Sequence, residues 1–343
     1  MNYSVKIAGW DKPVTVEMGQ TILDAAISQG VPYPHGCRSG NCGACKSRLI
    51  SGDVEMSPYS EFALTREEKD SGLVLACRSV PWENAEIAWL GEDETIVHPT
   101  RRMICRVTAL DDMTHDIKRI RLEILSGGPF SFSAGQYCSL TFSGQDARDY
   151  SMANTPEETE LEFHIRHVPG GASSAYVAQS LSIGDEVLVE GPYGTSWLRE
   201  AHRGPIIALA GGSGLAPIKS MVERALNLGM TQDIHLYVGV RNERDLYLED
   251  HFKALHETHS NLKFVPVLSE AGPGASGRRV GFLHEAVAAD FTDLDGCKAY
   301  LAGPPPMVEA ATAMMLDRGA RREDIHADAF YTEADKASLE SPQ

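Results

Sequence analysis

The sequence lacks several features that would place the protein in another class. Among its 343 residues, no apolar run approaches the roughly 20 residues that a membrane-spanning helix needs, so we expect no membrane partner. The segment Met1 to Trp10 alternates like a strand and has no charged-then-apolar leader, so we expect no signal peptide and a cytoplasmic location. Basic residues are also scarce, with 31 Lys and Arg against 48 Asp and Glu and a net charge of −17. Such a chain has no general attraction for phosphate backbones, and we expect no nucleic-acid partner.

Some metal and catalytic signatures are missing as well. No Cys-x-His pair suggests a Rieske centre, and no spaced carboxylate–histidine triad suggests a mononuclear iron. We find no general-base constellation for a bound organic substrate. The hydrophobic fraction of 43% and charged fraction of 23% are ordinary for a globular protein and exclude a disordered, collagen-like or coiled-coil chain. In a reducing compartment, seven cysteines indicate metal or redox chemistry rather than a disulfide framework.

The pattern of apolar residues divides the chain into three zones, as its length also suggests. The predicted domains are residues 1–93, 103–203 and 204–331, with a polar linker at 94–102 and a loose tail at 332–343. In the first zone, two short alternating strands precede a helix that begins after the N-cap Thr21 and ends near Gly30. The first domain is therefore predicted to be α+β.

The second and third zones differ in their periodicity. The second has short β-rich runs between Gly and Pro turns, at Ile104–Val107, Ile117–Leu125, Gln136–Phe142, Leu161–Val168 and Glu186–Val189. With one helix at Ser173–Leu181, it predicts a small antiparallel barrel. In the third, buried strands such as Pro205–Ala210 and Ile234–Val240 alternate with helices such as Pro217–Leu228. This alternation predicts a parallel α/β sheet that is covered on both faces.

Four cysteines share the spacing C-x4-C-x2-C plus one distant member, which is typical of a plant-type [2Fe–2S] site. They are Cys37, Cys42, Cys45 and Cys77. Three glycines among them let the backbone bend around a cluster and donate amides to its sulfurs. The alternative, structural zinc, usually shows two short Cys/His pairs. The other three cysteines, Cys105, Cys138 and Cys297, are predicted to be small buried apolar residues.

Two signals in the second zone indicate a flavin. Arg148 could pair with a phosphate, Tyr150 could lie on an aromatic ring, and Ser151 could bond to a ring heteroatom. The second signal is a strand, a glycine turn and a helix start, whose amides and serine hydroxyls could hold a phosphate. Its residues are His164, Ile165, Arg166, Gly171, Ala172, Ser173 and Ser174. Taken alone, the first signal also fits an ordinary barrel strand and the second fits helix capping.

In the third zone, Gly and Pro residues mark three strand ends. The predicted nucleotide-binding residues there are Gly212, Ser213, Gly214, Arg241, Gly303, Pro304 and Met307. The first three open a helix directly after a buried strand, so a pyrophosphate could approach, although the motif is not G-x-G-x-x-G. Because the carboxyl ends of parallel strands meet at one edge, we expect the three to line one crevice. Each one alone also fits an ordinary strand-to-helix turn.

In this order, the motifs resemble those of the reductase components of aromatic ring-hydroxylating dioxygenase systems, particularly the naphthalene type. The resemblance extends from about Val5 to Tyr331. It implies a β-grasp plant-type ferredoxin domain, a barrel that binds FAD and a doubly wound domain that binds NAD. FAD is implied rather than FMN because the iron–sulfur domain comes first. The resemblance also implies that Phe330, or alternatively Tyr331, covers the flavin where nicotinamide enters. The chain departs from many relatives at Ala302, where they have a cysteine.

The resemblance implies that NADH gives a hydride to the flavin, with Tyr150, Ser151 and Phe330 beside it. Single electrons then pass to the [2Fe–2S] cluster and to a separate ferredoxin or terminal oxygenase in aromatic-compound degradation. NADH is favoured over NADPH because Glu243 and Asp245 would repel a 2′-phosphate, although Arg241 and Arg244 could attract one. The alternatives are a reductase of a di-iron monooxygenase, a reductase that deoxygenates nucleotide sugars, and a non-enzymatic iron–sulfur protein.

Overall fold

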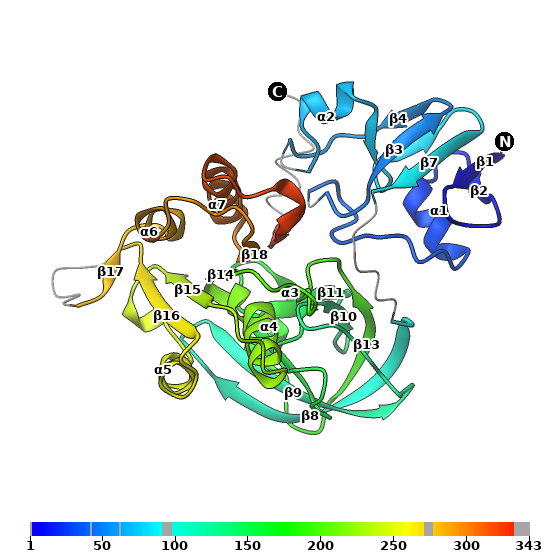
Figure 1. Ribbon diagram of the computed structural model, residues 1–343. Helices are drawn as coiled ribbons and strands as arrows, with labels where there is room; N and C mark the ends of the chain where they lie inside the picture. Colours follow the sequence, from blue (N-terminus) through cyan, green and yellow to red (C-terminus); the bar gives the residue numbers. More distant parts are fainter. Residues whose placement is uncertain (1, 42, 62, 91–97, 271–276, 333–343) are drawn as a thin grey trace. The chain divides into compact units, whose positions relative to one another are not determined.

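The computed structural model describes residues 2–41, 43–61, 63–90, 98–270 and 277–332 (Figure 1). These residues fall into two compact units. One contains the described residues up to Leu90 together with Tyr331 and Thr332, and the other is His98–Phe330. Among the helices of these residues, none is long and apolar enough to cross a membrane.

The first unit is a mixed sheet with a helix packed against it. Its elements are β1 (Asn2–Ile7), β2 (Val14–Glu17), α1 (Ile22–Ser28), β3 (Lys46–Ser51), β4 (Val54–Met56), α2 (Arg66–Asp70), β5 (Leu73–Leu75), β6 (Ser79–Pro81) and β7 (Ala85–Trp89). The strand order is β2-β1-β7-β3-β5, in which only β1 and β7 are parallel, and β4 pairs with β6 separately. The arrangement confirms the predicted β-grasp fold.

Local sequence explains how this unit begins. Val5 and Ile7 alternate with exposed residues, so one face of β1 enters the core. Thr21 caps α1 as predicted, because its hydroxyl accepts a hydrogen bond of 3.2 Å from the amide of Asp24.

The second unit begins with an antiparallel sheet that curls into a barrel. Its elements are β8 (Arg101–Asp112), β9 (Ile117–Ser126), β10 (Tyr137–Thr141), β11 (Arg148–Ser151), β12 (Leu161–Arg166), α3 (Ala172–Gln179) and β13 (Glu186–Tyr193). The order is β11-β10-β13-β8-β9-β12, and an antiparallel bridge between Met152 and Phe163 joins its two ends. This confirms the predicted barrel, although β8 begins at Arg101, two residues inside the expected linker.

A parallel sheet completes the second unit. Its strands are β14 (Ile206–Gly211), β15 (Ile234–Val240), β16 (Leu262–Leu268), β17 (Arg279–Val280), β18 (Lys298–Gly303) and β19 (Ile325–Ala329). Its helices are η1 (Gly212–Gly214), α4 (Leu215–Asn227), η2 (Glu243–Asp245), α5 (Glu249–Thr258), α6 (Leu283–Asp290), α7 (Pro305–Asp317) and η3 (Arg322–Asp324).

The topology of this sheet decides where a ligand can bind. The order is β17-β16-β15-β14-β18-β19, with every neighbouring pair parallel. Figure 1 shows α4 and α5 on one face and α6 and α7 on the other, as a doubly wound fold requires. The strand order reverses between β14 and β18, so the preferred ligand crevice lies at the carboxyl ends of these two strands.

Candidate functional site

The cysteine loop, meaning residues 35–45 with the turn around Cys77, is the first part of the site. The loop between α1 and β3 carries Cys37 and Cys45, and Cys77 follows β5. Cys45 and Cys77 are buried, and Cys37 is half-buried. The fourth predicted ligand, Cys42, lies outside the described residues.

Backbone geometry shapes this loop around its sulfurs. The amide of Asn41 donates to Cys37 Sγ over 3.2 Å, and the amide of Cys77 donates to Cys45 Sγ over 3.4 Å. Gly43 has a φ of 74°, and a Cβ there would stand 2.9 Å from a backbone carbonyl oxygen. Amides that point at a sulfur atom stabilise its thiolate form. The loop therefore favours cysteine thiolates, the form in which cysteine binds metal ions.

The chemistry of these sulfurs fits a [2Fe–2S] cluster. The bond to the Cys45 thiol, together with burial, raises the pKa of Cys77 far above its usual range, although the Gly40 amide lowers it. Thiols crowded in this way lose their protons readily only beside a metal cation. Each described cysteine is a free thiol, so none of the described ligands is consumed in a disulfide.

Strand β11 carries the first flavin signal. Arg148 is exposed, and the ring of Tyr150 packs edge-on against Phe142 with centroids 6.4 Å apart. Burial raises the pKa of Tyr150 to about 12, so its hydroxyl stays neutral. Ser151 is buried on the other face of the strand, where its hydroxyl donates to Asp328 Oδ2 over 3.3 Å. Asp328, on β19, is a partner of the predicted site residue Ser151 that the sequence reasoning missed.

The turn before α3 carries the second flavin signal. Gly171 is the N-cap, and within the described residues no side chain caps the helix. The hydroxyl of Ser173 donates to the carbonyl of Asp146 over 3.0 Å, and that of Ser174 donates to the carbonyl of Gly171 over 3.1 Å. An anion at this helix end would therefore be bound by backbone amides, with Ala172 as the first helical residue, rather than by donated hydroxyl hydrogens.

The side chains of His164 and Ile165, two predicted cofactor-binding residues, are both buried in the protein. Ile165 is in the barrel core, and His164 is buried between Tyr247 Oη at 3.1 Å and Glu162 Oε1 at 3.0 Å. Because a carboxylate only accepts, His164 Nε2 donates to Glu162 and Nδ1 accepts from Tyr247. A cofactor contact from this part of β12 is thus left to the backbone or to Arg166.

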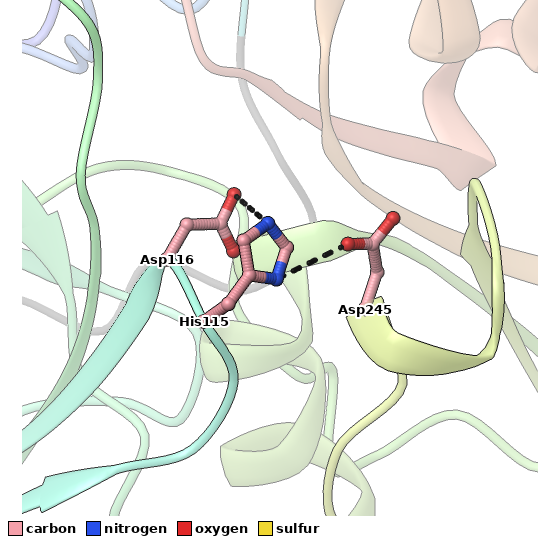
Figure 2. A group of neighbouring side chains, drawn as sticks. All are labelled: His115, Asp116 and Asp245. Carbon is pink, nitrogen blue, oxygen red and sulfur yellow. Dashed lines mark ion pairs between the residues drawn. The ribbon is translucent and has the colours of Figure 1, made fainter.

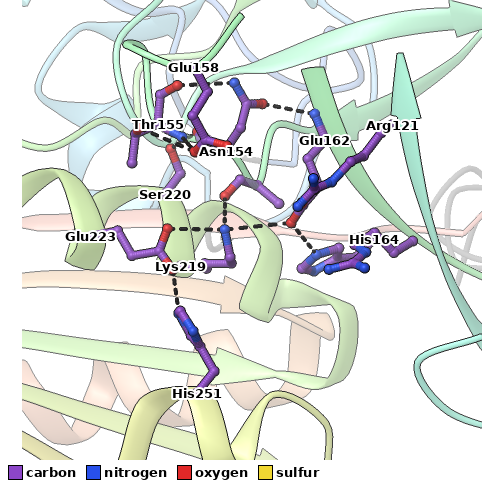
Figure 3. Close-up of polar contacts among 12 residues, drawn as sticks. Arg121, Asn154, Thr155, Glu158, Glu162, His164, Lys219, Ser220, Glu223 and His251 are labelled. Carbon is purple, nitrogen blue, oxygen red and sulfur yellow. Dashed lines mark hydrogen bonds and ion pairs between the residues drawn. The ribbon is translucent and has the colours of Figure 1, made fainter. Parts of the chain in front are cut away.

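Glu162 anchors a buried charged network that joins the barrel to α4 (Figure 3). Lys219 Nζ lies 3.5 Å from Glu162 and 3.0 Å from Glu223, and it donates to the carbonyl of Ala153 over 3.0 Å. Burial pushes the pKa of Glu162 upward, but the bond from His164 and the charge of Lys219 outweigh it and hold the pKa below its usual range. The network fixes the barrel against the parallel sheet.

The predicted nucleotide residues meet at the switch point between β14 and β18. A Cβ on Gly214 would overlap the carbonyl oxygen of Ala302, and one on Gly211 would stand 2.6 Å from Met307 Sδ. Gly303 has a φ of 147°, and its carbonyl accepts a bond of 2.9 Å from the Phe330 amide. The turn at Gly212, Ser213 and Gly214 is therefore packed directly against Gly303, Pro304 and the start of α7.

The charges beyond β15 differ from the simple expectation about NADH. Arg241 Nε donates to Asp245 over 3.1 Å, and Arg278 Nε donates to Glu243 over 3.1 Å. Asp245 is only 5% exposed, whereas 68% of the Arg244 side chain is exposed. Both acidic residues that were expected to repel a 2′-phosphate are thus paired with arginines. The preference for NADH over NADPH therefore stays a prediction, which kcat/KM measured with each nucleotide tests.

Comparisons with known proteins identify three domains in the chain. The chain matches a 2Fe-2S iron-sulfur cluster binding domain over residues 5–81, an oxidoreductase FAD-binding domain over 104–197 and an oxidoreductase NAD-binding domain over 208–313. All three cofactors predicted from the sequence, a [2Fe–2S] cluster, FAD and NAD, are thereby confirmed.

Similar proteins share the whole domain order. The chain is 43% identical to the ferredoxin–NAD(P)+ reductase component of the naphthalene 1,2-dioxygenase/salicylate 5-hydroxylase systems of Ralstonia sp, over 93% of this chain and 95% of that protein. It is 38% identical to the reductase component of phenol 2-monooxygenase from Pseudomonas sp. strain CF600, over 99% and 98%. Among solved structures, the Amycolatopsis cytochrome P450 reductase GcoB gives a TM-score of 0.78 at 36% identity, covering 96% of this chain and 98% of that one. The chain therefore belongs to the family of ferredoxin–NAD(P)+ reductase components that join a [2Fe–2S] domain, an FAD-binding domain and an NAD-binding domain in one polypeptide.

Proposed function

We propose that this chain is the reductase of a multicomponent aromatic ring-hydroxylating dioxygenase. It takes electrons from NADH and delivers them to a separate ferredoxin or to the terminal oxygenase. The observation that carries the proposal is the 43% identity to a naphthalene dioxygenase reductase component across 95% of that protein. The free thiols of the described cysteines support a cytoplasmic location.

The residues of the barrel prepare a flavin site. FAD held there would supply the chemistry that accepts a hydride from NADH and releases single electrons toward the [2Fe–2S] cluster. Tyr150 offers a neutral ring against which a planar ligand stacks, and Arg148 offers an exposed guanidinium for a phosphate. Asp328 orients the hydroxyl of Ser151 through the bond of 3.3 Å.

The residues of the parallel sheet prepare the site for NADH. Gly212 lets the backbone approach the pyrophosphate, and Gly214 lets the turn pack against Ala302. The start of α4, which has no side-chain cap, supplies a positive helix end. Phe330 is the aromatic residue that we assign to the flavin face, because its amide is bonded to Gly303 at the same sheet edge.

The cysteine loop prepares the last carrier before the partner. Cys37, Cys42, Cys45 and Cys77 would ligate the irons, with the amides of Asn41 and Cys77 stabilising the sulfur charge. Up to Glu94 the sequence has 8 Lys and Arg against 14 Asp and Glu, a balance of −6. This charge suits a partner with a basic docking surface, and docking should slow as salt is added.

One observation favours a second class of electron acceptor. The match to the phenol 2-monooxygenase reductase component covers 99% of this chain, whereas the match to the naphthalene-type component covers 93%. A monooxygenase could therefore be the acceptor of the electrons instead of a dioxygenase.

A reconstituted activity assay distinguishes the two possible electron acceptors. The purified reductase is mixed with NADH and with either a naphthalene-type dioxygenase plus its ferredoxin or a phenol-type monooxygenase, and hydroxylated product is measured. We expect coupled product with the dioxygenase and only background with the monooxygenase. The opposite pattern would assign the chain to the monooxygenase class.

A further inference from the structure

Three acidic and imidazole side chains gather where the barrel meets the parallel sheet (Figure 2). His115 and Asp116, from the turn between β8 and β9, and Asp245, from η2, place ligand atoms within 4.8 Å of one another. The cluster resembles a cation site, but arginines already neutralise it. Arg166 Nε lies 2.8 Å from Asp116, and Arg241 Nε lies 3.1 Å from Asp245. A metal ion would meet these guanidinium groups, so the cluster does not suit one.

The carboxylate of Asp116 is held in a fixed position. The hydroxyl of Thr114 donates to Asp116 Oδ1 over 2.9 Å. Thr114 Oγ1 in turn accepts the amides of Asp116 at 3.2 Å and Ile117 at 3.0 Å. The carbonyl of Asp116 accepts the amide of His167 over 2.7 Å, which ties the turn to the end of β12. Asp116 Oδ2 faces Arg166 and Arg241, and His115 Nε2 lies 3.9 Å from it.

Arg166 links this carboxylate to the glycine turn. Its bond to Asp116 uses Nε, and its Nη1 lies only 3.2 Å from where a Cβ of Gly212 would stand. The guanidinium of a barrel residue thus lies at the turn that follows β14. Arg241 Nη2, from the end of β15, lies 3.8 Å from the same carboxylate of Asp116.

We propose that Asp116 is a positioning residue for the dinucleotide. It holds Arg166 at the Gly212 turn and draws Arg241 toward the same carboxylate, so that the two guanidinium groups bind the pyrophosphate of the nicotinamide nucleotide together. The inference rests on the proposed NADH site. It assigns Arg166 to the nicotinamide nucleotide, whereas the sequence suggested the flavin.

The sign of one mutational effect distinguishes this role from simple electrostatics. A carboxylate near a pyrophosphate repels it, so removing the charge of Asp116 should tighten nucleotide binding if Asp116 has no positioning role. If Asp116 positions Arg166, its removal weakens binding, although the site becomes more positive.

The test uses the full chain loaded with FAD and its cluster, mixed anaerobically with increasing NADH while flavin absorbance is followed. For Asp116→Asn, we expect the apparent Kd for NADH to rise about tenfold, while the limiting reduction rate changes less than about twofold. The matched control is Asp112→Asn at the end of β8, which removes a 74% exposed carboxylate paired with Lys118 and should leave the Kd unchanged.

Two further variants keep the test decisive. Thr114→Val alters no charge but releases Asp116, and we expect the Kd to rise about threefold. In an Arg166→Ala background, Asp116→Asn should add no further rise.

Three results would overturn the inference: a tighter or unchanged Kd in Asp116→Asn, an unchanged Kd in Thr114→Val, or an Asp116→Asn effect that persists without Arg166. If Asp116→Asn does not fold, Thr114→Val alone decides. Failure of NADH to reduce the flavin of the wild type would instead refute the proposed function, and the inference with it.

Discussion

The cysteine loop and the charged seam are built on different principles. The charged seam, meaning Asp116, Glu162, Arg166, Lys219 and Arg241, holds the barrel and the parallel sheet together through charged side chains. The cysteine loop instead depends on amide-to-sulfur bonds and on glycines with positive φ. The cysteine loop would hold a cluster that stays bound, and a rigid backbone is appropriate for that task. The charged seam borders a site that binds and releases a nucleotide, and there side chains can exchange hydrogen-bond partners.

The largest effect should come from breaking the buried ion pair between Glu162 and Lys219. Glu162→Gln leaves Lys219 buried with Glu223 as its remaining carboxylate, and we expect a loss of about 3 kcal/mol in the free energy of unfolding. Urea denaturation measures this loss. The control, Glu123→Gln, removes an exposed partner of Arg106 at 3.9 Å and should cost less than about 0.5 kcal/mol. Equal costs for the two variants would contradict a special role for the buried network.

The cysteine loop should fail through its backbone. Gly43→Ala places a Cβ 2.9 Å from the carbonyl of Ala63 at a φ of 74°, which costs about 1–3 kcal/mol and should release iron from the protein. The control, Gly72→Ala, has a φ of 89° but meets nothing within 4 Å, so its iron should be retained. Iron and acid-labile sulfide per chain are the measurements. If Gly43→Ala kept its full iron content, the cysteine loop would tolerate a side chain at this position.

Salt should separate the two regions in the wild type. Between about 0.05 and 0.5 M salt, we expect the Kd for NADH to rise several-fold, because the arginines of the seam are screened. Iron content should not change over the same range, because few charges hold the loop. The Kd comes from flavin reduction and the iron content from visible absorbance. If the Kd for NADH did not change with salt concentration, binding of the nucleotide by the arginines would be contradicted.

Acid should weaken a smaller ion pair at the end of the sheet. The hydrogen bond from Arg278 lowers the pKa of Glu249 from 4.5 to about 2 in the folded chain. The stabilisation, about 1 kcal/mol, is therefore complete above pH 4.5 and is lost as the pH falls toward 2. The difference in urea midpoint between wild type and Glu249→Gln should shrink from pH 6 to pH 3.5. If the difference in urea midpoint between wild type and Glu249→Gln grew as the pH fell, the predicted effect of the Glu249–Arg278 ion pair would be contradicted.

The sequence predicted those parts of the fold that depend on local periodicity. Strands of the barrel and helices of the parallel sheet, such as α4 at Leu215–Asn227 against the expected Pro217–Leu228, lie within a few residues of their expected bounds. Strand β8 is longer than expected and extends to Asp112 rather than Val107. Strands β3 to β7 escaped prediction because they are short and follow a turn-rich segment. Strand β19 escaped because Ile325–Ala329 mixes polar and apolar residues without a clean alternation.

The site was harder to predict where its partners are distant in sequence. Ser151 and Asp328 are 177 positions apart, so no spacing rule joins them. Lys219 did leave a signal, because a lysine stands among the apolar residues at the start of α4. The partner of Arg166 could not be inferred, since Asp116 looks like an ordinary turn residue until the barrel closes and brings the two side chains together.

The most direct test of the electron path is anaerobic mixing of NADH with the wild type and with Cys77→Ser, followed by flavin and cluster absorbance. In the wild type, flavin bleaching should precede cluster bleaching, and a one-electron acceptor should then be reduced. In Cys77→Ser, the flavin should still bleach at the wild-type rate, with no cluster phase and little reduction of the acceptor. If the variant reduces the acceptor as fast as the wild type, electrons do not leave through the cysteine loop and the account is wrong.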